Sequence, residues 1–258
     1  MSPERDLARI RGALEAARRR LARLAPGAMR VELKDGGDPV TAADRSIDEL
    51  LRATLPRPGE GWLSEETSDD ARRLDSRRVW IVDPLDGTRE FVGGIPEYCV
   101  SVGLAVDGEP VAGGICNPAS GQTILGARGL GVLLNGRPAR ISRRRSLHGA
   151  LVLASRSEVG RGEWERFRDG PFRFRAVGSV AYKMALVAAG LADATFSLVP
   201  KHEWDVAGGA ALVLAAGGVV LHPDGTPPRF NRRTPHLAGL LAAAPGLADA
   251  LLELLGRA

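Results

Sequence analysis

The sequence has few of the residues from which disulfide-bonded, membrane-spanning and nucleic-acid-binding proteins are built. Its 258 residues include two cysteines and only 5% aromatic residues. No apolar run approaches the roughly 20 residues of a membrane-spanning helix, and residues 1–6 lack the charged and then apolar pattern of a signal peptide. These absences disfavour a secreted or membrane-bound protein, and we expect a cytoplasmic one with no membrane partner.

The cysteines and histidines do not show the spacing of metal ligands. Cys99 and Cys116 lie in apolar, strand-like runs, which favours two buried thiols over a disulfide bond. The histidines are interpreted as structural or exposed residues: His148, His202, His222 and His236.

Positive charge slightly exceeds negative charge, with a formal net charge of +4 and a sequence pI of about 9.6. The arginine runs at 18–20, 143–145 and 232–233 are scattered and have no interleaved aromatic residues. We therefore expect no nucleic acid polymer as a partner. A basic surface can still attract a small polyanionic substrate.

Hydrophobic periodicity predicts an α+β arrangement in the first part of the chain. Apolar residues at helical spacing predict helices over 4–24 and 41–55. Alternating apolar residues predict an antiparallel sheet with strands at 61–63, 79–82, 98–106, 111–116 and 122–125. The segment 126–131 superficially resembles a dinucleotide-binding loop. It continues into an Asn-Gly hairpin over 132–137, which excludes that interpretation.

The second part of the chain alternates strands and helices, which is typical of an α/β arrangement. We expect strands at 151–154, 172–177, 194–198, 218–221 and 237–242. We expect helices at 158–167, 180–189, 205–216 and 247–255. The arginine-rich stretch at 142–146 lies between the two patterns. The predicted organisation is thus an N-terminal half over 1–145, with most of the acidic site residues, and a C-terminal half over 146–258.

The stretch from Val79 to Thr88 contains the strongest chemical signal. It indicates a buried strand that breaks at Pro84 and then opens a short helix, with Asp83 and Asp86 at the break. Two carboxylates on such a turn can point at one small region, and hard divalent cations require a cluster of oxygen ligands. The helix start offers backbone N–H groups to an anion. Taken alone, the same residues also fit an ordinary strand exit with an N-cap.

Two further segments place carboxylates at the ends of predicted elements. Glu65 and Glu66 follow the first short strand, and Asp205 opens a helix of small residues. By themselves, the glutamates fit a solvated loop and the aspartate fits a helix cap. Together with the turn at 83–88, they predict an acidic site assembled from distant segments.

The order of these motifs resembles the inositol monophosphatase superfamily of magnesium-dependent, lithium-sensitive phosphatases. That superfamily has an (S/G)-E-E element, then D-P-x-D-G-T-x-x-F, then W-D-x-A-(A/G)-G running on to A-G-G. The matching residues here are Ser64–Glu66, Asp83–Thr88 with Phe91, Trp204–Gly209 and Ala216–Gly218. Thr41–Asp44 and Leu133–Pro138 resemble two further elements, so the resemblance spans nearly the whole chain in the correct order.

The resemblance implies a layered αβαβα sandwich of the inositol monophosphatase and fructose-1,6-bisphosphatase type, with the active site between the two halves. It also implies two or three Mg²⁺ ions per site. Carried over position by position, their ligands are Glu65, Asp83, Asp86, Asp205 and the main-chain carbonyl of Leu85.

Catalytic roles follow from the same resemblance. Thr88 and Asp44, together with the metal ligand Glu65, match residues that position and deprotonate the attacking water, while Glu66 matches a supporting residue. Bound metal ions neutralise the phosphate charge and lower the pKa of a water molecule. The backbone N–H groups of Gly87 and Thr88 are expected to bind phosphate oxygens, an approach that a side chain at position 87 would crowd.

The substrate prediction depends on weaker residues. A glutamate that contacts a sugar hydroxyl in inositol monophosphatases corresponds to Leu198 here, which cannot make that hydrogen bond. Glu203, in an E-W-D segment, and Ser179, followed by Lys183, resemble the 3′(2′),5′-bisphosphate nucleotidase branch, where such a lysine meets the second phosphate. Lys183 also fits a lysine on a helix face. We predict hydrolysis of adenosine 3′,5′-bisphosphate to AMP and phosphate, with Ser179, Lys183 and Glu203 as substrate contacts.

Two other functions stay open on the sequence alone. One is a phosphatase for inositol 1-phosphate, histidinol phosphate or another sugar or polyol phosphate. The other is a non-catalytic phosphate-ligand sensor, which the complete acidic set disfavours. The expected partners are a small phosphorylated substrate and, by the resemblance, a second copy in a homodimer. The loop 34–39 fits either a flap over the metals or an ordinary connection.

Overall fold

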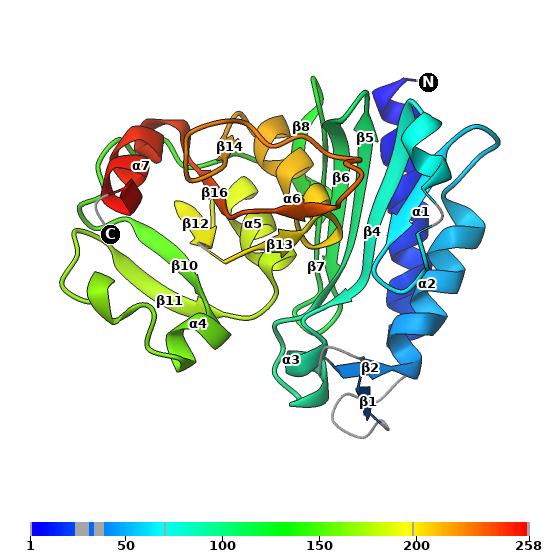
Figure 1. Ribbon diagram of the computed structural model, residues 1–258, viewed down its shortest axis with the longest axis horizontal. Helices are drawn as coiled ribbons and strands as arrows, with labels where there is room; N and C mark the ends of the chain where they lie inside the picture. Colours follow the sequence, from blue (N-terminus) through cyan, green and yellow to red (C-terminus); the bar gives the residue numbers. More distant parts are fainter. Residues whose placement is uncertain (1, 24–30, 34–38, 70, 198, 257–258) are drawn as a thin grey trace.

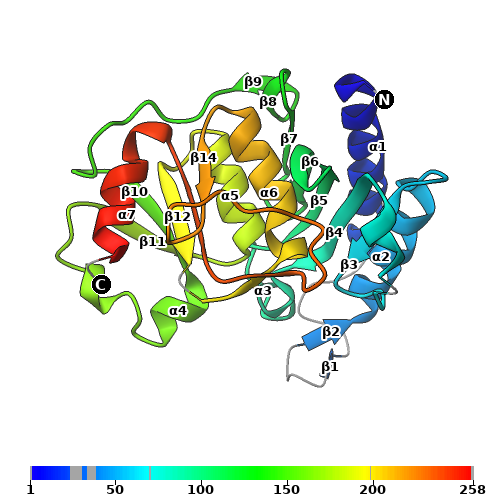
Figure 2. The same ribbon diagram turned by 45° about the horizontal axis from the view of Figure 1, so that its top comes forward.

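Five layers of secondary structure make up the fold (Figures 1 and 2). The structure is a computed structural model that describes residues 2–23, 31–33, 39–69, 71–197 and 199–256. The first layer contains the helices α1 (Pro3–Leu21) and α2 (Ala42–Thr54). The third layer, between two sheets, contains α5 (Val180–Ala188) and α6 (Glu203–Ala215). The predicted αβαβα sandwich is confirmed.

The second layer is a seven-stranded sheet in which sequential strands are neighbours. Its strands are β3 (Gly61–Ser64), β4 (Arg78–Asp86), β5 (Cys99–Val106), β6 (Glu109–Asn117), β7 (Gln122–Ala127), β8 (Gly131–Leu134) and β9 (Arg137–Ala139). All pairs are antiparallel except β3 with β4, which is parallel because the connection 65–77 returns the chain to the starting end of β3. The predicted sheet thus has one parallel pair at its edge.

The fourth layer is a five-stranded mixed sheet with the order β11-β10-β12-β16-β14. Its strands are β10 (Leu151–Ser155), β11 (Arg173–Val177), β12 (Ala194–Ser197), β14 (Val219–Leu221) and β16 (Leu240–Ala243). β10 is parallel to β11 and β12, as the strand–helix alternation predicts, whereas β16 is antiparallel to β12 and β14.

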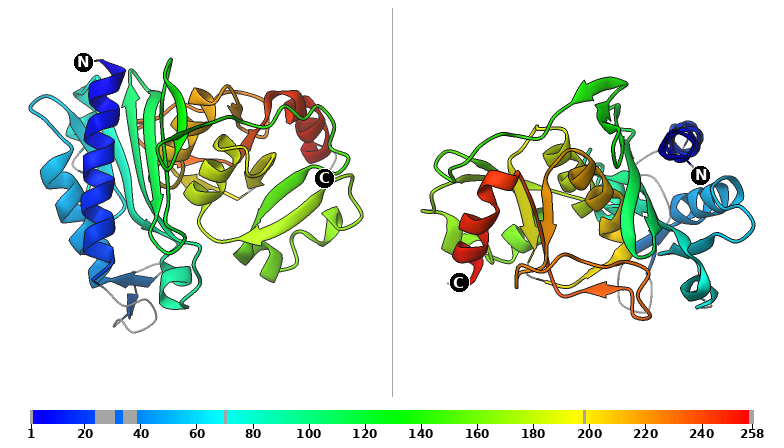
Figure 3. Two further views of the ribbon diagram at one scale, coloured as in Figure 1. Left: turned by 180° about the vertical axis from the view of Figure 1, so that it is seen from behind. Right: turned by 90° about the horizontal axis from the view of Figure 1, so that it is seen from above.

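The fifth layer and the connections consist of short elements. α4 (Arg156–Gly160), η2 (Glu165–Phe167), η3 (Pro245–Leu247) and α7 (Ala248–Gly256) contribute to the outer layer. The connections include β1 (Val31–Leu33), β2 (Pro39–Thr41), η1 (Arg72–Asp75), α3 (Thr88–Val92), β13 (Lys201–His202) and β15 (His236–Leu237). Figure 3 shows α1 along the outer face of the seven-stranded sheet and α7 at the opposite end of the molecule.

Three apolar cores lie between the layers, and β4 shows how the sequence divides its side chains between two of them. Val79 and Ile81 face the central core with α5 and α6. Trp80 and Val82 face the core under α1 and α2. Both faces of the strand are covered, so successive residues are all apolar instead of alternating with polar ones. The third core packs the five-stranded sheet against the outer helices.

Two predicted elements differ from the structure. The helix expected over 158–167 is instead the short helix α4, a turn and η2. Gly162 in that turn has a φ of 81°, in the left-handed region that interrupts an α-helix. The strand expected over 237–242 is divided between β15 and β16, which pair with different strands. The division of the chain at about residue 145 stays a prediction.

Three further predictions concern the two cysteines, membrane-spanning helices and the loop at residues 34–39. Cys99 and Cys116 are buried free thiols, as expected. Across the described part of the chain, no helix combines the length and the apolar character needed to cross a membrane. The loop 34–39 lies largely outside the described residues, and so does Leu198.

A buried ionic network joins α1 to the edge of the seven-stranded sheet. The Glu60 side chain is 4% exposed and accepts hydrogen bonds from Arg9 Nη1 (3.0 Å), Trp80 Nε1 (2.9 Å) and Arg78 Nε (3.1 Å). Arg78 also donates to Asp6 at 2.6 Å. Burial by itself raises the pKa of Glu60, but the hydrogen bonds from Arg9, Trp80 and Arg78 lower it to about 2.

We expect Glu60→Gln to lower the free energy of unfolding by about 3 kcal/mol at pH 7, because it leaves Asp6 as the nearest counter-charge for Arg9 and Arg78. The folded-state pKa lies below the unfolded one, so this contribution is present above about pH 4.5 and is lost as the pH falls towards 2. Urea unfolding of both proteins at pH 7 and pH 3 measures it. An equal difference at both pH values would contradict the ionic origin.

Candidate active site

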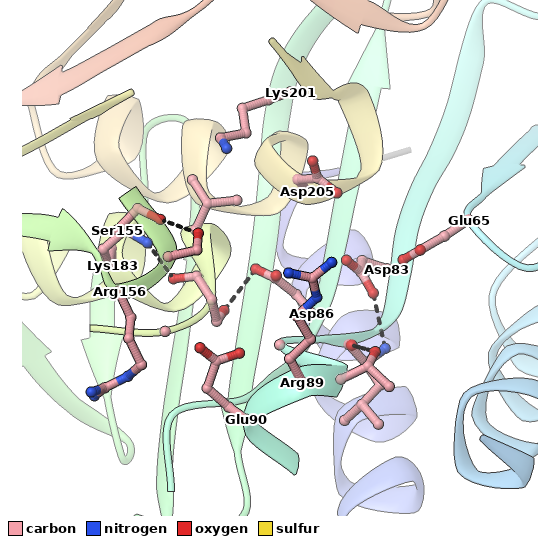
Figure 4. A pocket seen from close by; sticks show the side chains of 17 residues that line it. Glu65, Asp83, Asp86, Arg89, Glu90, Ser155, Arg156, Lys183, Lys201 and Asp205 are labelled. Atoms are coloured by element: carbon pink, nitrogen blue, oxygen red, sulfur yellow. Dashed lines mark hydrogen bonds between the residues drawn. The ribbon is translucent and has the colours of Figure 1, made fainter. Parts of the chain in front are cut away.

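One pocket collects the predicted site residues at the place where the two sheets meet. It is lined by residues that follow β3, end β4, begin α3, α4 and α5, and precede or begin α6. They are Glu65, Asp83, Leu85–Glu90, Ser155–Ser157, Gly178–Val180, Lys183, Lys201 and Asp205. Figure 4 shows Glu65, Asp83 and Asp205 on one side, Lys183 and Arg156 on the other, and Asp86 between them.

The acidic side of the pocket has the donors of a cation site. Glu65, Asp83 and Asp205 each offer a carboxylate oxygen, and these oxygens lie within 4.8 Å of one another. Burial, followed by the charges of the neighbouring carboxylates, raises the pKa of Asp83 and of Asp205 well above the ordinary range. Crowded carboxylates of this kind are stabilised in the ionised form by a divalent cation, and oxygen donors suit Mg²⁺. The residues therefore fit the predicted metal.

Asp86 contributes to the pocket in a different way from the other three carboxylates. Its Oδ2 atom accepts hydrogen bonds from Ser179 Oγ at 2.6 Å and from the backbone N–H of Ala181 at 2.7 Å. These bonds attach the end of β4 to the start of α5. Oδ1 is consequently the atom with which Asp86 can bind a cation. Ser179 thus contacts a predicted metal ligand in addition to lining the pocket.

The predicted water-activating residues lie in contact with one another. The Thr88 hydroxyl is 3.0 Å from both Asp44 Oδ1 and the carbonyl oxygen of Leu85. Asp44 is buried at the start of α2, where its Oδ2 accepts the backbone N–H of Thr41 at 2.8 Å. Asp44 itself does not line the pocket. The structure therefore places it behind Thr88, in contact with the threonine hydroxyl and outside the pocket lining.

Gly87 is required by its own backbone conformation. Its φ is +94°, in the left-handed region. A Cβ atom there would lie 3.0 Å from the carbonyl oxygen of Glu97 and 3.2 Å from Tyr98 Cα. A side chain would strain the turn between β4 and α3 before any ligand arrived.

The loop that carries Glu65 is held by a residue that the motifs did not single out. Asp48, on α2, is 6% exposed and accepts hydrogen bonds from Ser64 Oγ and Thr67 Oγ1, each at 2.5 Å. These two residues flank Glu65 and Glu66 in sequence. Asp48 lies one helical turn after Asp44. An acidic residue on the apolar face of this helix is the signal that identifies it.

Asp205 reaches the other carboxylates because α6 packs unusually close to the seven-stranded sheet. A Cβ atom on Gly113 would lie 2.4 Å from the carbonyl oxygen of Gly208, and one on Gly208 would lie 2.6 Å from Ser101 Oγ. Only glycines allow this separation between helix and sheet. The Asp205 carboxylate also caps its own helix, accepting the backbone N–H of His202 at 2.9 Å.

The opposite side of the pocket is basic, and the sequence predicted only part of it. Lys183 is 4% exposed, and its ammonium donates to the carbonyl oxygens of Val177 at 3.3 Å and Ser179 at 3.2 Å. Burial lowers its pKa to about 8. The other lining residues that the motifs did not predict to bind substrate are Arg89, Glu90, Ser155, Arg156, Ser157, Val180 and Lys201. Arg89 and Glu90 directly follow the motif residue Thr88, and Lys201 lies four residues before Asp205, whereas residues 155–157 belong to a segment that no motif marked.

Glu203 does not join the pocket, which corrects the prediction that it contacts the substrate. It is fully buried, and its carboxylate accepts the backbone N–H groups of Asn231 at 2.7 Å and Arg232 at 2.9 Å. Arg73 bonds the same loop through the Asn231 side chain at 2.7 Å. Glu203 therefore anchors the loop at 231–232 beside α6.

Comparison with known proteins identifies the family. Residues 5–257 match the inositol monophosphatase family. The chain belongs to this family. An inositol-1-monophosphatase of Mesorhizobium japonicum is 38% identical over 206 residues, which cover 76% of this chain and 77% of the relative. The Nus factor SuhB of Xylella fastidiosa is 35% identical over 222 residues, covering 81% and 76%.

Solved structures of the inositol monophosphatase family agree with the fold. The extragenic suppressor protein suhB of Bartonella henselae has a TM-score of 0.81 and 31% identity, covering 96% of this chain and 97% of that one. An inositol monophosphatase of Thermotoga maritima has a TM-score of 0.83 and 26% identity, covering 95% and 94%. The predicted superfamily is confirmed. Its members are phosphatases that generally use Mg²⁺ ions.

We expect Asp48→Ala to weaken Mg²⁺ binding about tenfold or more, since residues that orient metal ligands typically contribute 10–100-fold to affinity. Isothermal titration with Mg²⁺ measures the change. Asp48→Asn, which keeps an oxygen acceptor, is expected to lose less. The control is Glu49→Ala, because Glu49 is exposed on the same helix. Wild-type affinity in the Asp48→Ala protein would contradict the positioning role.

Proposed function

We propose that the protein is a magnesium-dependent phosphomonoesterase, and the convergence of Glu65, Asp83 and Asp205 is the observation that carries this proposal. These three carboxylates, with Asp86 Oδ1 and the Leu85 carbonyl, would hold the metal. Mg²⁺ bound there would neutralise the charge of the phosphate, activate a water molecule and stabilise the leaving oxygen.

The chain itself supplies the path for the proton of the attacking water. Thr88 Oγ faces the pocket and lies 3.0 Å from Asp44 Oδ1. In the proposed reaction the threonine hydroxyl accepts a proton from water while donating its own to Asp44. Asp44 is buried and its Oδ2 is bonded to the backbone N–H and the hydroxyl of Thr41. These bonds hold Oδ1 towards Thr88. The backbone N–H groups of Gly87 and Thr88 line the same wall and are proposed to bind phosphate oxygens.

The charge balance of the pocket favours a substrate with a second anionic group. Five carboxylates and four cationic side chains line it. Two bound Mg²⁺ ions would leave an excess of about three positive charges, whereas a phosphate monoester supplies about two negative ones at neutral pH. We therefore propose adenosine 3′,5′-bisphosphate as the leading substrate. Lys183, which lines the pocket beside Ser179, is a proposed contact for its second phosphate.

Inositol 1-phosphate is the second candidate, and the relatives favour it. The proteins of Mesorhizobium japonicum and Solanum lycopersicum that resemble this chain at 35–38% identity are named inositol monophosphatases. Their similarity extends over about three quarters of the chain. A small polyol phosphate would use the same acidic side of the pocket and leave the basic side to the solvent.

A phosphate-release assay tests both the reaction and the substrate. We expect Mg²⁺-dependent release that stops when a chelator is added, with a higher kcat/KM for adenosine 3′,5′-bisphosphate than for inositol 1-phosphate or histidinol phosphate. A higher value for inositol 1-phosphate would select the second candidate. Absence of release from every ester would contradict the enzyme proposal and favour a sensor.

We expect Asp86→Asn to lower kcat at least about 100-fold while the protein stays folded, because the change removes a charged ligand facing the reacting phosphate. The asparagine oxygen can still accept the bonds from Ser179 and Ala181, so thermal unfolding should differ little from the wild type. Steady-state kinetics at saturating Mg²⁺ provides the measurement. Activity near the wild-type value would refute the assignment of Asp86.

A further inference from the structure

Lysine is rare in this chain, and both lysines in the described residues line the active-site pocket. Of the 35 lysine and arginine residues, three are lysines: Lys34, Lys183 and Lys201. Lys183 and Lys201 face the pocket from α5 and β13. The two cations differ in chemistry, since an ammonium is a compact point charge and a guanidinium is a broad planar fork. Two of the three lysines in a chain rich in arginine therefore line this one pocket.

Lys201 is held at the rim of the pocket by a buried carboxylate. Its side chain is 19% exposed, and its Nζ atom lies 3.9 Å from Oε1 of Glu158, whose side chain is 5% exposed. That distance fits an ion pair but is long for a hydrogen bond. The N–H groups of the ammonium are therefore not committed to Glu158 and can donate to the oxygens of a ligand.

Glu158 is itself fixed from two directions. Its Oε1 accepts the Ser197 hydroxyl at 2.6 Å, and its Oε2 accepts the Trp164 indole N–H at 3.0 Å. Trp164 stacks on Phe196 with a ring separation of 4.5 Å. The carboxylate thus extends from a rigid aromatic cluster towards Lys201, and Figure 4 shows Lys201 beside Asp205 above the pocket.

We infer that Lys201 is a specificity-determining contact for a second anionic group of the substrate and that Glu158 is the residue that positions it. This inference rests on the proposed phosphomonoesterase function. Because the buried carboxylate attracts the ammonium to the rim before a ligand arrives, the anion meets a charge that is already in place and less side-chain entropy is lost on binding. Lys183 and Arg156 line the side of the pocket opposite Glu65 and Asp83, and Lys201 lies beside Asp205 (Figure 4).

The experiment compares substrates that differ only in the second phosphate. Adenosine 3′,5′-bisphosphate is paired with adenosine 3′-monophosphate, and inositol 1,4-bisphosphate with inositol 1-phosphate, so that the preference ratio of kcat/KM isolates the second anionic group. In Lys201→Met we expect this ratio to fall about tenfold or more, mainly through KM, the usual size of a lost hydrogen bond between charged groups. Lys201→Arg should keep part of the preference.

Glu158→Gln tests the positioning role, because glutamine can still accept a bond from Ser197 or Trp164 but carries no charge. In Glu158→Gln alone we expect the kcat/KM preference ratio to fall about threefold. Adding Glu158→Gln to Lys201→Met should not lower the ratio below that of Lys201→Met, because the two residues act through one contact. Glu165→Gln is the matched control. It removes the same charge from the same part of the chain, where Glu165 is 61% exposed and paired with Arg168.

The possible outcomes distinguish a failure of the inference from a failure of the proposed function. A preference ratio near one in the wild type, or an unchanged ratio in Lys201→Met, overturns the role of Lys201. An equal loss from Glu158→Gln in the presence and absence of Lys201 overturns the positioning role. If Glu158→Gln does not fold, Ser197→Ala replaces it in the test, because it removes one of the hydrogen bonds that hold the Glu158 carboxylate. No Mg²⁺-dependent turnover by the wild type contradicts the proposed function itself, and the inference with it.

Discussion

Repulsion among the carboxylates of Glu65, Asp83 and Asp205, of which Asp83 is buried and the other two are half-buried, is the constraint on which the rest of the structure depends. Carboxylates this close, and away from bulk water, oppose one another's ionisation, and burial and neighbouring charges accordingly raise the pKa values of Asp83 and Asp205. An isolated turn or helix end would relax by moving its carboxylate into the solvent. The three oxygens stay within 4.8 Å because each is attached to an element that cannot move away.

Those attachments come from the first three layers of the sandwich. Asp48, on an outer helix, holds the loop of Glu65. The contact of Gly208 with the seven-stranded sheet holds α6, and with it Asp205. The bonds from Asp86 to the start of α5 fix the end of β4 against the central helices. The acidic site is therefore a property of the closed fold, and damage to any of these contacts should separate the carboxylates before it unfolds the protein.

The sequence predicted the acidic side well and the basic side poorly, for a physical reason. Asp83 and Asp86 share one turn, so their motif also fixes their relative geometry. Arg156 and Lys201 come from separate elements, and their convergence depends on packing that no local pattern records. The prediction that Glu203 contacts the substrate was wrong because Glu203 lies two residues before Asp205 on one helix, and residues with that spacing point to different faces. The five layers were expected from the resemblance of the motifs to the superfamily, and the apolar run from Val79 to Val82 agrees with a strand that is covered on both faces. The helix expected over 158–167 was wrong because Gly162 turns the chain.

The two sides of the pocket come largely from different elements, which limits what family membership says about the substrate. The acidic side is built from β3, β4 and α6, and it determines that a phosphate ester is hydrolysed with the help of a metal. The basic side is built from α4, α5 and β13, and the side chains of Lys183 and Lys201 are not among the proposed metal ligands. Relatives can share the chemistry through Asp83 and Asp205 while differing at the positions of Lys183 and Lys201. The choice of substrate must therefore be argued from those two lysines and from the buried Glu158 that fixes one of them.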